Sequence, residues 1–167
     1  MKRLVTASIA ALALAGAGTT AAADGSYGPW QPTYQGAITA PAGSVCPFTV
    51  TAEPVREDLR FRYHYDASGN VDGYQATGQL IAKITNVETG ASVVRNLSGP
   101  GTVTFNADGS YDAVVDGDFL VFFLAQDEPS NALLLFSGQT VLHGAPNGAK
   151  TLVAHSGQVE NLCDTLS

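Results

Sequence analysis

Short segments with the alternation of a β-strand recur along most of this chain, and turn residues separate them. The alternation is clearest in residues 59–65. One face of that segment would carry Leu59, Phe61, Tyr63 and Tyr65, and the other Arg60, Arg62 and His64. A period of two residues is typical of a half-buried strand with one face toward a core.

Turn chemistry predicts how these segments connect. The sequence Asn-Ala-Asp-Gly-Ser at 106–110 predicts a hairpin between residues 102–105 and 111–115. Further strands are expected at 50–54, 79–87, 91–97, 119–125, 132–142 and 150–162. No segment after the first residues has a sustained helical period. The pattern predicts an all-β, antiparallel meander, folded as an up-and-down barrel or, alternatively, as a β-sandwich.

The two cysteines, Cys46 and Cys163, stand 117 residues apart, near the first and last predicted strands. An even count in an exported protein predicts a disulfide. A bridge between the first and last strands favours the barrel, because barrel closure places those strands side by side.

The first residues have the three parts of a secretory signal. Lys2 and Arg3 precede an uncharged stretch at 4–16, and three alanines at 21–23 supply a cleavage site. We expect a signal helix at 1–23, an extended aromatic arm at 24–44, and a single β domain at 45–167. The mature protein would be secreted and extracellular. The alternative is an uncleaved membrane anchor, for which the apolar stretch is short.

Charge limits the partners of the mature chain. All 15 acidic residues follow Ala23, whereas two of the 8 basic residues precede it, so the remainder has a formal charge of −9. Nucleic acids and anionic membranes attract cationic surfaces. We therefore expect no nucleic acid and no membrane as partner after cleavage. A small ligand or a protein partner fits better, with the chain a monomer or a homodimer.

Catalytic motifs are missing from the sequence. It contains neither Gly-x-Ser-x-Gly nor His-Glu-x-x-His. The histidines at 64, 143 and 155 lie on or beside three separate predicted strands, and the aspartates at 108–118 do not have calcium-loop spacing. We expect no metal and no cofactor. The sequence predicts a non-catalytic binding or interaction module. The alternatives are a barrel enzyme, isomerase-like or cyclase-like, with Tyr63, Tyr65 or His64 as acid or base, and a self-associating cell-envelope protein.

Residues 60–65 are the candidate ligand site. Arg60 and Arg62 are two of the six basic residues after Ala23, and with His64 they would form a cationic stripe that suits an anion. The opposite, aromatic face, which includes Tyr63 and Tyr65, would line a barrel lumen for an apolar ligand. The alternative is a solvated outer face over a filled core.

Residues 119–124 are apolar at every position, although a strand on a soluble sheet normally has one polar face. The second face needs a cover from the arm, a second subunit or an apolar partner. We expect the arm to fold across this strand and to bury Trp30.

Four short motifs stand out: Cys-Pro-Phe-Thr-Val at 46–50, Ile-Thr-Asn-Val-Glu-Thr-Gly at 84–90, Leu-Ser-Gly-Pro-Gly-Thr at 97–102 and Gly-Gln-Val-Glu-Asn-Leu-Cys at 157–163. They resemble motifs of small exported proteins of actinobacteria. The similarity covers most of residues 45–167. It implies secretion and a compact β-fold, and it implies no activity, ligand or catalytic residue.

Overall fold

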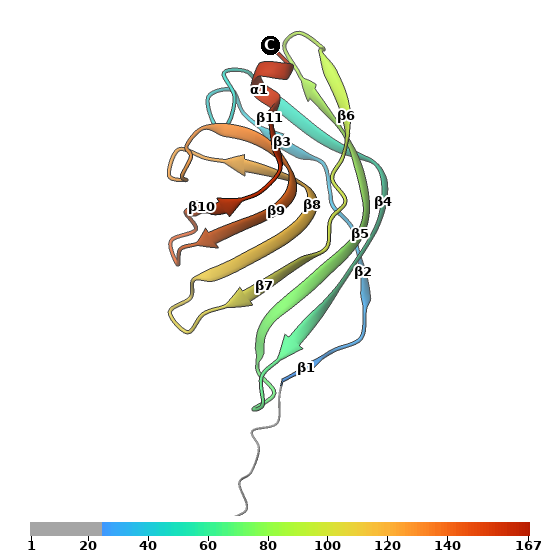
Figure 1. Ribbon diagram of the computed structural model, residues 1–167. Helices are drawn as coiled ribbons and strands as arrows, with labels where there is room; N and C mark the ends of the chain where they lie inside the picture. The colour runs from blue at the N-terminus through green and yellow to red at the C-terminus, as the bar shows by residue number, and fades with distance from the viewer. Residues whose placement is uncertain (1–24) are drawn as a thin grey trace, which may run out of the picture.

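The computed structural model describes residues 25–167, so the predicted signal helix lies outside the described residues. The described chain forms one antiparallel sheet and a short C-terminal helix (Figure 1). Its elements are β1 (Ser26–Tyr27), β2 (Gln31–Thr33), β3 (Ile38–Ala40), β4 (Val50–Tyr65), β5 (Val71–Asn86), β6 (Ser92–Asn96), β7 (Gly101–Phe105), β8 (Tyr111–Phe123), β9 (Ala132–Gly144), β10 (Lys150–His155), β11 (Gln158–Asn161) and α1 (Leu162–Thr165). No helix among the described residues is long and apolar enough to cross a membrane.

The strands pair as a meander, which confirms the predicted all-β, antiparallel fold. The main path runs β1-β4-β5-β7-β8-β9-β10. β6 and β7 share β5 as a neighbour, because β6 pairs with Ile81–Thr85 and β7 pairs with Gly73–Ala76. The sequence Leu-Ser-Gly-Pro at 97–100 interrupts what would otherwise be one strand. β11 pairs with one half of β9 and β10 with the other half.

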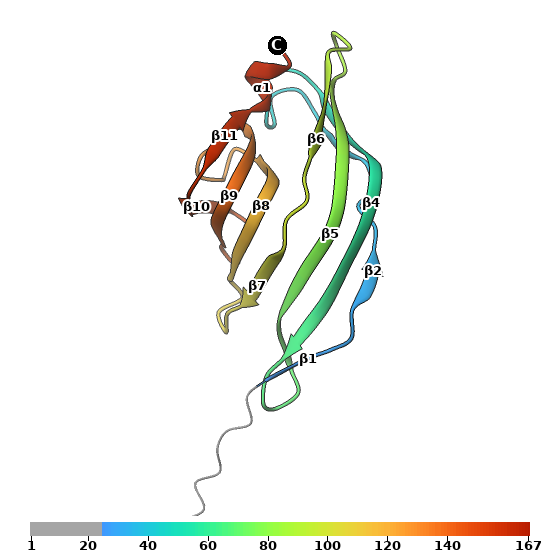
Figure 2. The same cartoon turned by 45° about the vertical axis from the view of Figure 1, so that its right-hand side comes forward.

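The sheet curls into a half-barrel with two facing walls, one of β4 and β5 and the other of β8 and β9 (Figure 2). Among residues 25–167, no ladder joins β4 to β10 or β11, so backbone pairing leaves the curl open. Side chains connect the walls instead. Arg95 of β6 donates two hydrogen bonds to the carboxylate of Glu160 of β11, at 2.8 and 2.7 Å.

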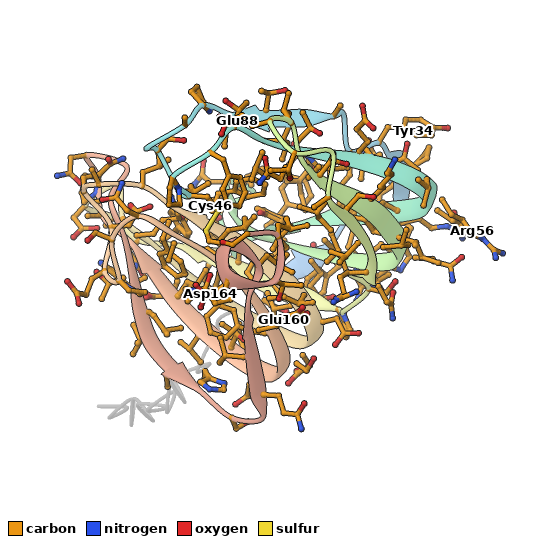
Figure 3. All side chains as sticks on the ribbon, turned by 90° about the horizontal axis from the view of Figure 1, so that it is seen from above. Tyr34, Cys46, Arg56, Glu88, Glu160 and Asp164 are labelled. Atoms are coloured by element: carbon orange, nitrogen blue, oxygen red, sulfur yellow. A yellow bond between two sulfur atoms is a disulfide. The ribbon has the colours of Figure 1, made fainter. Side chains whose placement is uncertain are left out.

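The Cys46–Cys163 disulfide forms as predicted, with the two Cα atoms 5.3 Å apart. It joins the segment before β4 to α1, and both cysteines are buried. Figure 3 shows Cys46 near Asp164 of α1 at one end of the half-barrel. The bridge therefore holds the start and the finish of the β domain together at one end of the half-barrel.

β4 is longer than the two strands that the sequence predicts in its place. Residues 50–54 and 59–65 belong to one strand of 16 residues that runs along β5. A register shift between Pro54 and Arg56 reverses the alternation there. A β-bulge inserts one residue without ending the strand. The alternation of inward and outward residues changes phase there, so the sequence predicts two short strands in place of one long strand.

A crease of glycines crosses the sheet where the strands bend. Gly117 of β8 pairs with Gly138 of β9, and their φ angles are +111° and +109°. A Cβ atom on Gly138 would lie 2.2 Å from the carbonyl oxygen of Ser156. Only glycine combines this φ with so close a backbone approach. The crease therefore lets β8 and β9 curl instead of lying flat.

Residues 119–124 are covered on both faces by the chain's own β domain. Val121 and Phe123 lie in a cluster with Phe136 and Leu142. Leu120, Phe122 and Leu124 pack against a second cluster that contains Val50, Ile84, Leu133 and Leu135. The curl of the half-barrel gives this strand two apolar surroundings, which explains why every position is apolar.

The arm lies elsewhere, so the prediction that it buries Trp30 over residues 119–124 is wrong. β1, β2 and β3 all pair along the free edge of β4. Trp30 remains 42% exposed. Backbone pairing with an open sheet edge satisfies peptide groups that a loose arm would leave to water, and this pairing determines where the arm lies.

Candidate functional site

The predicted cationic stripe lies on β4, but its members have separate partners. Arg60 is largely exposed and has one ion pair, with Asp58 at 3.5 Å. His64 Nδ1 lies 2.5 Å from Asp72 Oδ1, and the ring of His64 meets the ring of Tyr27 edge-on. The carboxylates beside Arg60 and His64 offset the positive charge that an anion would need.

Arg62 is held by three groups. Its Nε and Nη2 atoms donate to Gln75 Oε1 at 3.0 and 2.7 Å. The guanidinium lies over the rings of Tyr27 and Trp30, with Cζ 4.2 and 4.6 Å from the ring centroids. Cation–π contacts of this kind stabilise the guanidinium in its position over the two rings. Arg62 therefore anchors the arm to the outer face of the sheet.

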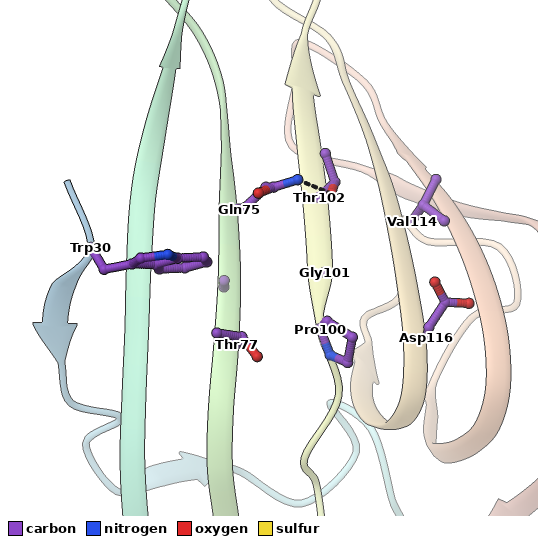
Figure 4. A pocket seen from close by; sticks show the side chains of 9 residues that line it. Trp30, Gln75, Thr77, Pro100, Gly101, Thr102, Val114 and Asp116 are labelled. Carbon is purple, nitrogen blue, oxygen red and sulfur yellow. Dashed lines mark hydrogen bonds between the residues drawn. The ribbon is translucent and has the colours of Figure 1, made fainter. Parts of the chain in front are cut away.

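A shallow hollow of about 260 Å³ opens beside this anchor on the outer face (Figure 4). Trp30 reaches from the arm across β4 and forms one wall of it. Gln75 donates to Thr102 across the opposite rim at 3.5 Å. Thr77 and Asp116 contribute further polar groups to its lining.

The aromatic candidates Tyr63 and Tyr65 do not line the interior of the half-barrel. Tyr63 is 38% exposed, and its ring packs edge-on against Phe61, with centroids 5.2 Å apart. Tyr65 lies beside Gly28 of the arm. From the alternating segment 59–65, only Leu59 contributes to the interior hollow. The structure thus divides the predicted site residues between the outer face and the rim.

A second hollow, of about 600 Å³, lies inside the half-barrel. The sequence suggests such a lumen, but with Tyr63 and Tyr65 in its lining and not the residues that form it. Its walls come mainly from β4, β5, β7 and β8, with single residues of β3, β9 and β10 and four residues between strands. The lining side chains are Gln35, Ile38, Ala52, Pro54, Leu59, Tyr74, Ala76, Leu80, Ala82, Leu97, Val103, Tyr111, Ala113, Val115, Phe119, Leu120, Val121, Phe122, Leu142 and Lys150, with Gly36, Gly99 and Gly101.

Small residues explain why this space is not filled. Ala76 of β5 pairs with Gly101 of β7, and Gly101 pairs with Val115 of β8. In most small barrels, large inward side chains occupy the lumen. Here alanine and glycine occupy several inward positions in adjacent strands, so a hollow of ligand size remains.

Two tyrosines supply polar groups to the lining. Burial, together with the neighbouring Tyr111, raises the pKa of Tyr74, which keeps its phenol protonated. Tyr111 lies across β9, since a Cβ atom on Gly144 would meet its ring. A protonated phenol can donate a hydrogen bond and accept one.

Lys150 is the one cationic residue that lines the hollow, and it is paired. Its Nζ lies 2.6 Å from Asp127 Oδ2, and the Asp127 side chain is fully buried. Burial acts to raise the pKa of Asp127, but hydrogen bonds from Lys150 and Leu124 outweigh it and lower the pKa. The pair is therefore ionised and internally neutral.

Among residues 25–167, no three His, Cys, Asp or Glu side chains gather in a way that could hold a metal ion. Comparison of the chain with protein-family models, curated proteins and solved structures found no match. The resemblance to exported actinobacterial proteins stays a prediction.

Proposed function

We propose that this protein is an exported, non-catalytic binding protein that carries an apolar small molecule in its interior hollow. The observation that carries the proposal is the lining. Its side chains are almost entirely aliphatic or aromatic, and alanines and glycines leave about 600 Å³ open. Concave, mostly apolar sites with a few polar groups are typical of small-molecule binding.

The hydrophobic effect would supply the affinity. A ligand that moves about 200 Å² of apolar surface from water into this lining gains roughly 5 kcal/mol. The walls are already in place, because the disulfide and the Arg95–Glu160 pair hold the two ends of the curl. A preformed site loses little of that free energy to ordering.

The lining also favours binding over catalysis. It includes no serine, cysteine, histidine, aspartate or glutamate, the residues that most often act as nucleophile or general acid and base. An isomerase-like or cyclase-like enzyme would have to use Tyr74, Tyr111 or the paired Lys150. The previously considered Tyr63, Tyr65 and His64 lie outside the hollow.

Export fits the disulfide, since structural disulfides persist in oxidising compartments. The sequence signal at 1–23 supports the same location. A role outside the cell would explain why an acidic, soluble carrier encloses an apolar molecule that water would not dissolve.

Fluorescence of diphenylhexatriene, a neutral hydrocarbon that brightens in apolar surroundings, tests the proposal. The mature protein should bind it. Ala76→Leu adds volume inside the hollow and should weaken binding about tenfold. Thr77→Leu is the matched control, because the next residue along β5 lines the outer hollow and not the interior.

Native mass spectrometry of protein from the culture supernatant should show one retained small molecule and give the subunit count. An absence of hydrocarbon binding, or equal effects of Ala76→Leu and Thr77→Leu, would refute binding in the interior. Assembly into large oligomers without a bound ligand would favour the cell-envelope alternative.

A further inference from the structure

The interior hollow has one distinct aromatic end. Tyr74 of β5 and Phe105 of β7 lie side by side, with ring centroids 6.0 Å apart. Phe105 pairs with Tyr111, the first residue of β8. Tyr111 in turn pairs with Gly144 of β9, across which its ring lies. Tyr74 and Tyr111 thus lie on strands that flank β7, in a lining whose other polar side chains are Gln35 and Lys150.

Neither phenol hydroxyl hydrogen-bonds to another group among residues 25–167, and neither oxygen is fully buried, so both hydroxyls are accessible. The pKa of Tyr74 is raised by burial and by Tyr111, with no hydrogen bond acting on it. A tyrosine hydroxyl that faces an apolar site normally finds a partner. These two hydroxyls are thus free to meet a polar atom of a ligand.

The same end offers no free positive charge. Lys150 pairs with Gly144 in the β9–β10 ladder, beside Tyr111, but its ammonium is bound to the buried Asp127. Asp127 also accepts hydrogen bonds from the backbone N–H groups of Leu124 and Lys150, both at 2.7 Å. Breaking this arrangement to serve a ligand would leave a buried carboxylate unpaired.

We propose that the ligand carries one uncharged hydrogen-bonding group, a hydroxyl or a carbonyl, that contacts Tyr74 and Tyr111, while its apolar body fills the rest of the hollow. This inference rests on the proposed function. The selective ligand class is a neutral apolar alcohol, ketone or aldehyde, and ionised fatty acids are disfavoured. A carboxylate in this lining would lose its hydration without gaining a cation.

Displacement of diphenylhexatriene by dodecanol and by dodecanoate, at a pH where the acid is ionised, tests the inference. The two competitors share one chain length and differ only in the head group. Dodecanol should displace the probe at a concentration roughly tenfold lower. The double variant Tyr74→Phe with Tyr111→Phe should weaken dodecanol binding about two- to tenfold for each hydroxyl removed.

The hydrocarbon probe provides the control within each variant, because it makes no hydrogen bond and should bind the double variant within about twofold of the parent. Tyr63→Phe, a phenol outside the lining, should leave dodecanol binding unchanged. Dodecanoate that binds as well as dodecanol, or a double variant that retains full dodecanol affinity, would overturn the inference and leave the proposed function standing. Failure of the probe to bind any form would refute the proposed function and the inference with it.

Discussion

The glycine crease gives the sharpest stability prediction. Gly138→Ala places a Cβ atom 2.2 Å from the carbonyl oxygen of Ser156, at a φ of +109°. The conformation alone costs an alanine about 1–3 kcal/mol. The overlap requires a backbone shift, which adds about 1–3 kcal/mol. The gain from restricting the unfolded chain offsets only about 0.4–1 kcal/mol.

We therefore expect Gly138→Ala to lower the free energy of unfolding by about 2–5 kcal/mol, a large share of the roughly 5–15 kcal/mol of a typical domain. Urea denaturation with the disulfide intact measures the change from the midpoint and slope. Because the crease shapes the curl, hydrocarbon binding in the hollow should weaken as well.

Two control variants separate the cost of the backbone conformation from the cost of the close approach to Ser156. Gly148 has a φ of +85° with nothing within 4 Å of the added Cβ, so Gly148→Ala tests the backbone conformation alone and should cost about 1–2 kcal/mol. Gly36 has open space and no such φ, and Gly36→Ala should be neutral within about 0.5 kcal/mol. If Gly138→Ala is no worse than Gly148→Ala, the close approach to Ser156 does not constrain the fold.

Two further predictions concern the outer face and the N-terminus. Arg62→Ala should lower the free energy of unfolding by about 1–2 kcal/mol in urea denaturation, because the hydrogen bonds to Gln75 and the stacking on Trp30 are lost. Replacement of the exposed Arg60 by alanine should change it by no more than about 0.5 kcal/mol. Equal effects of the two substitutions would contradict the anchoring role of Arg62. N-terminal sequencing of protein from the culture supernatant should begin near Asp24, and an intact Met1 on an exported chain would contradict cleavage.

Local chemistry predicts much of the fold. The Asp-Gly turn at 108–109, the alternation in residues 59–65 and the spacing of Cys46 and Cys163 depend on neighbours in sequence or on a single covalent bond, and the hairpin, the strand and the disulfide all form. The bulge in β4 was not predicted, although Pro54 directly precedes it and a proline within a strand often marks a bulge. The C-terminal helix α1 is too short to show a helical period.

The sequence suggests a lumen for an apolar ligand, but the residues that line it could not be predicted in this way, because the lining depends on which residues meet across strands. Ala76 and Gly101 are 25 positions apart in sequence, and only the β5–β7 register makes them neighbours. The alternation pointed to Tyr63, which pairs with Tyr74 and shares its face of the sheet, but of residues 59–65 only Leu59 lines the hollow. A run of small residues at alternate positions in several strands was the available signal.

Packed side chains fill the disulfide end of the half-barrel, whereas the hollow opens farther along β5. At the disulfide end, Val50, Ile84 and Leu162 are fully buried in a filled cluster beside Cys163. Farther along β5, Ala76 and Tyr74 face open space.

Large-to-small changes among buried residues remove packed atoms and cost several kcal/mol. Val121 and Leu142 line the hollow but belong to a buried cluster, so their replacement should lower stability as well. Tyr74 and Ala76 lie outside the buried clusters, and substitutions there should shift ligand preference at little cost in stability.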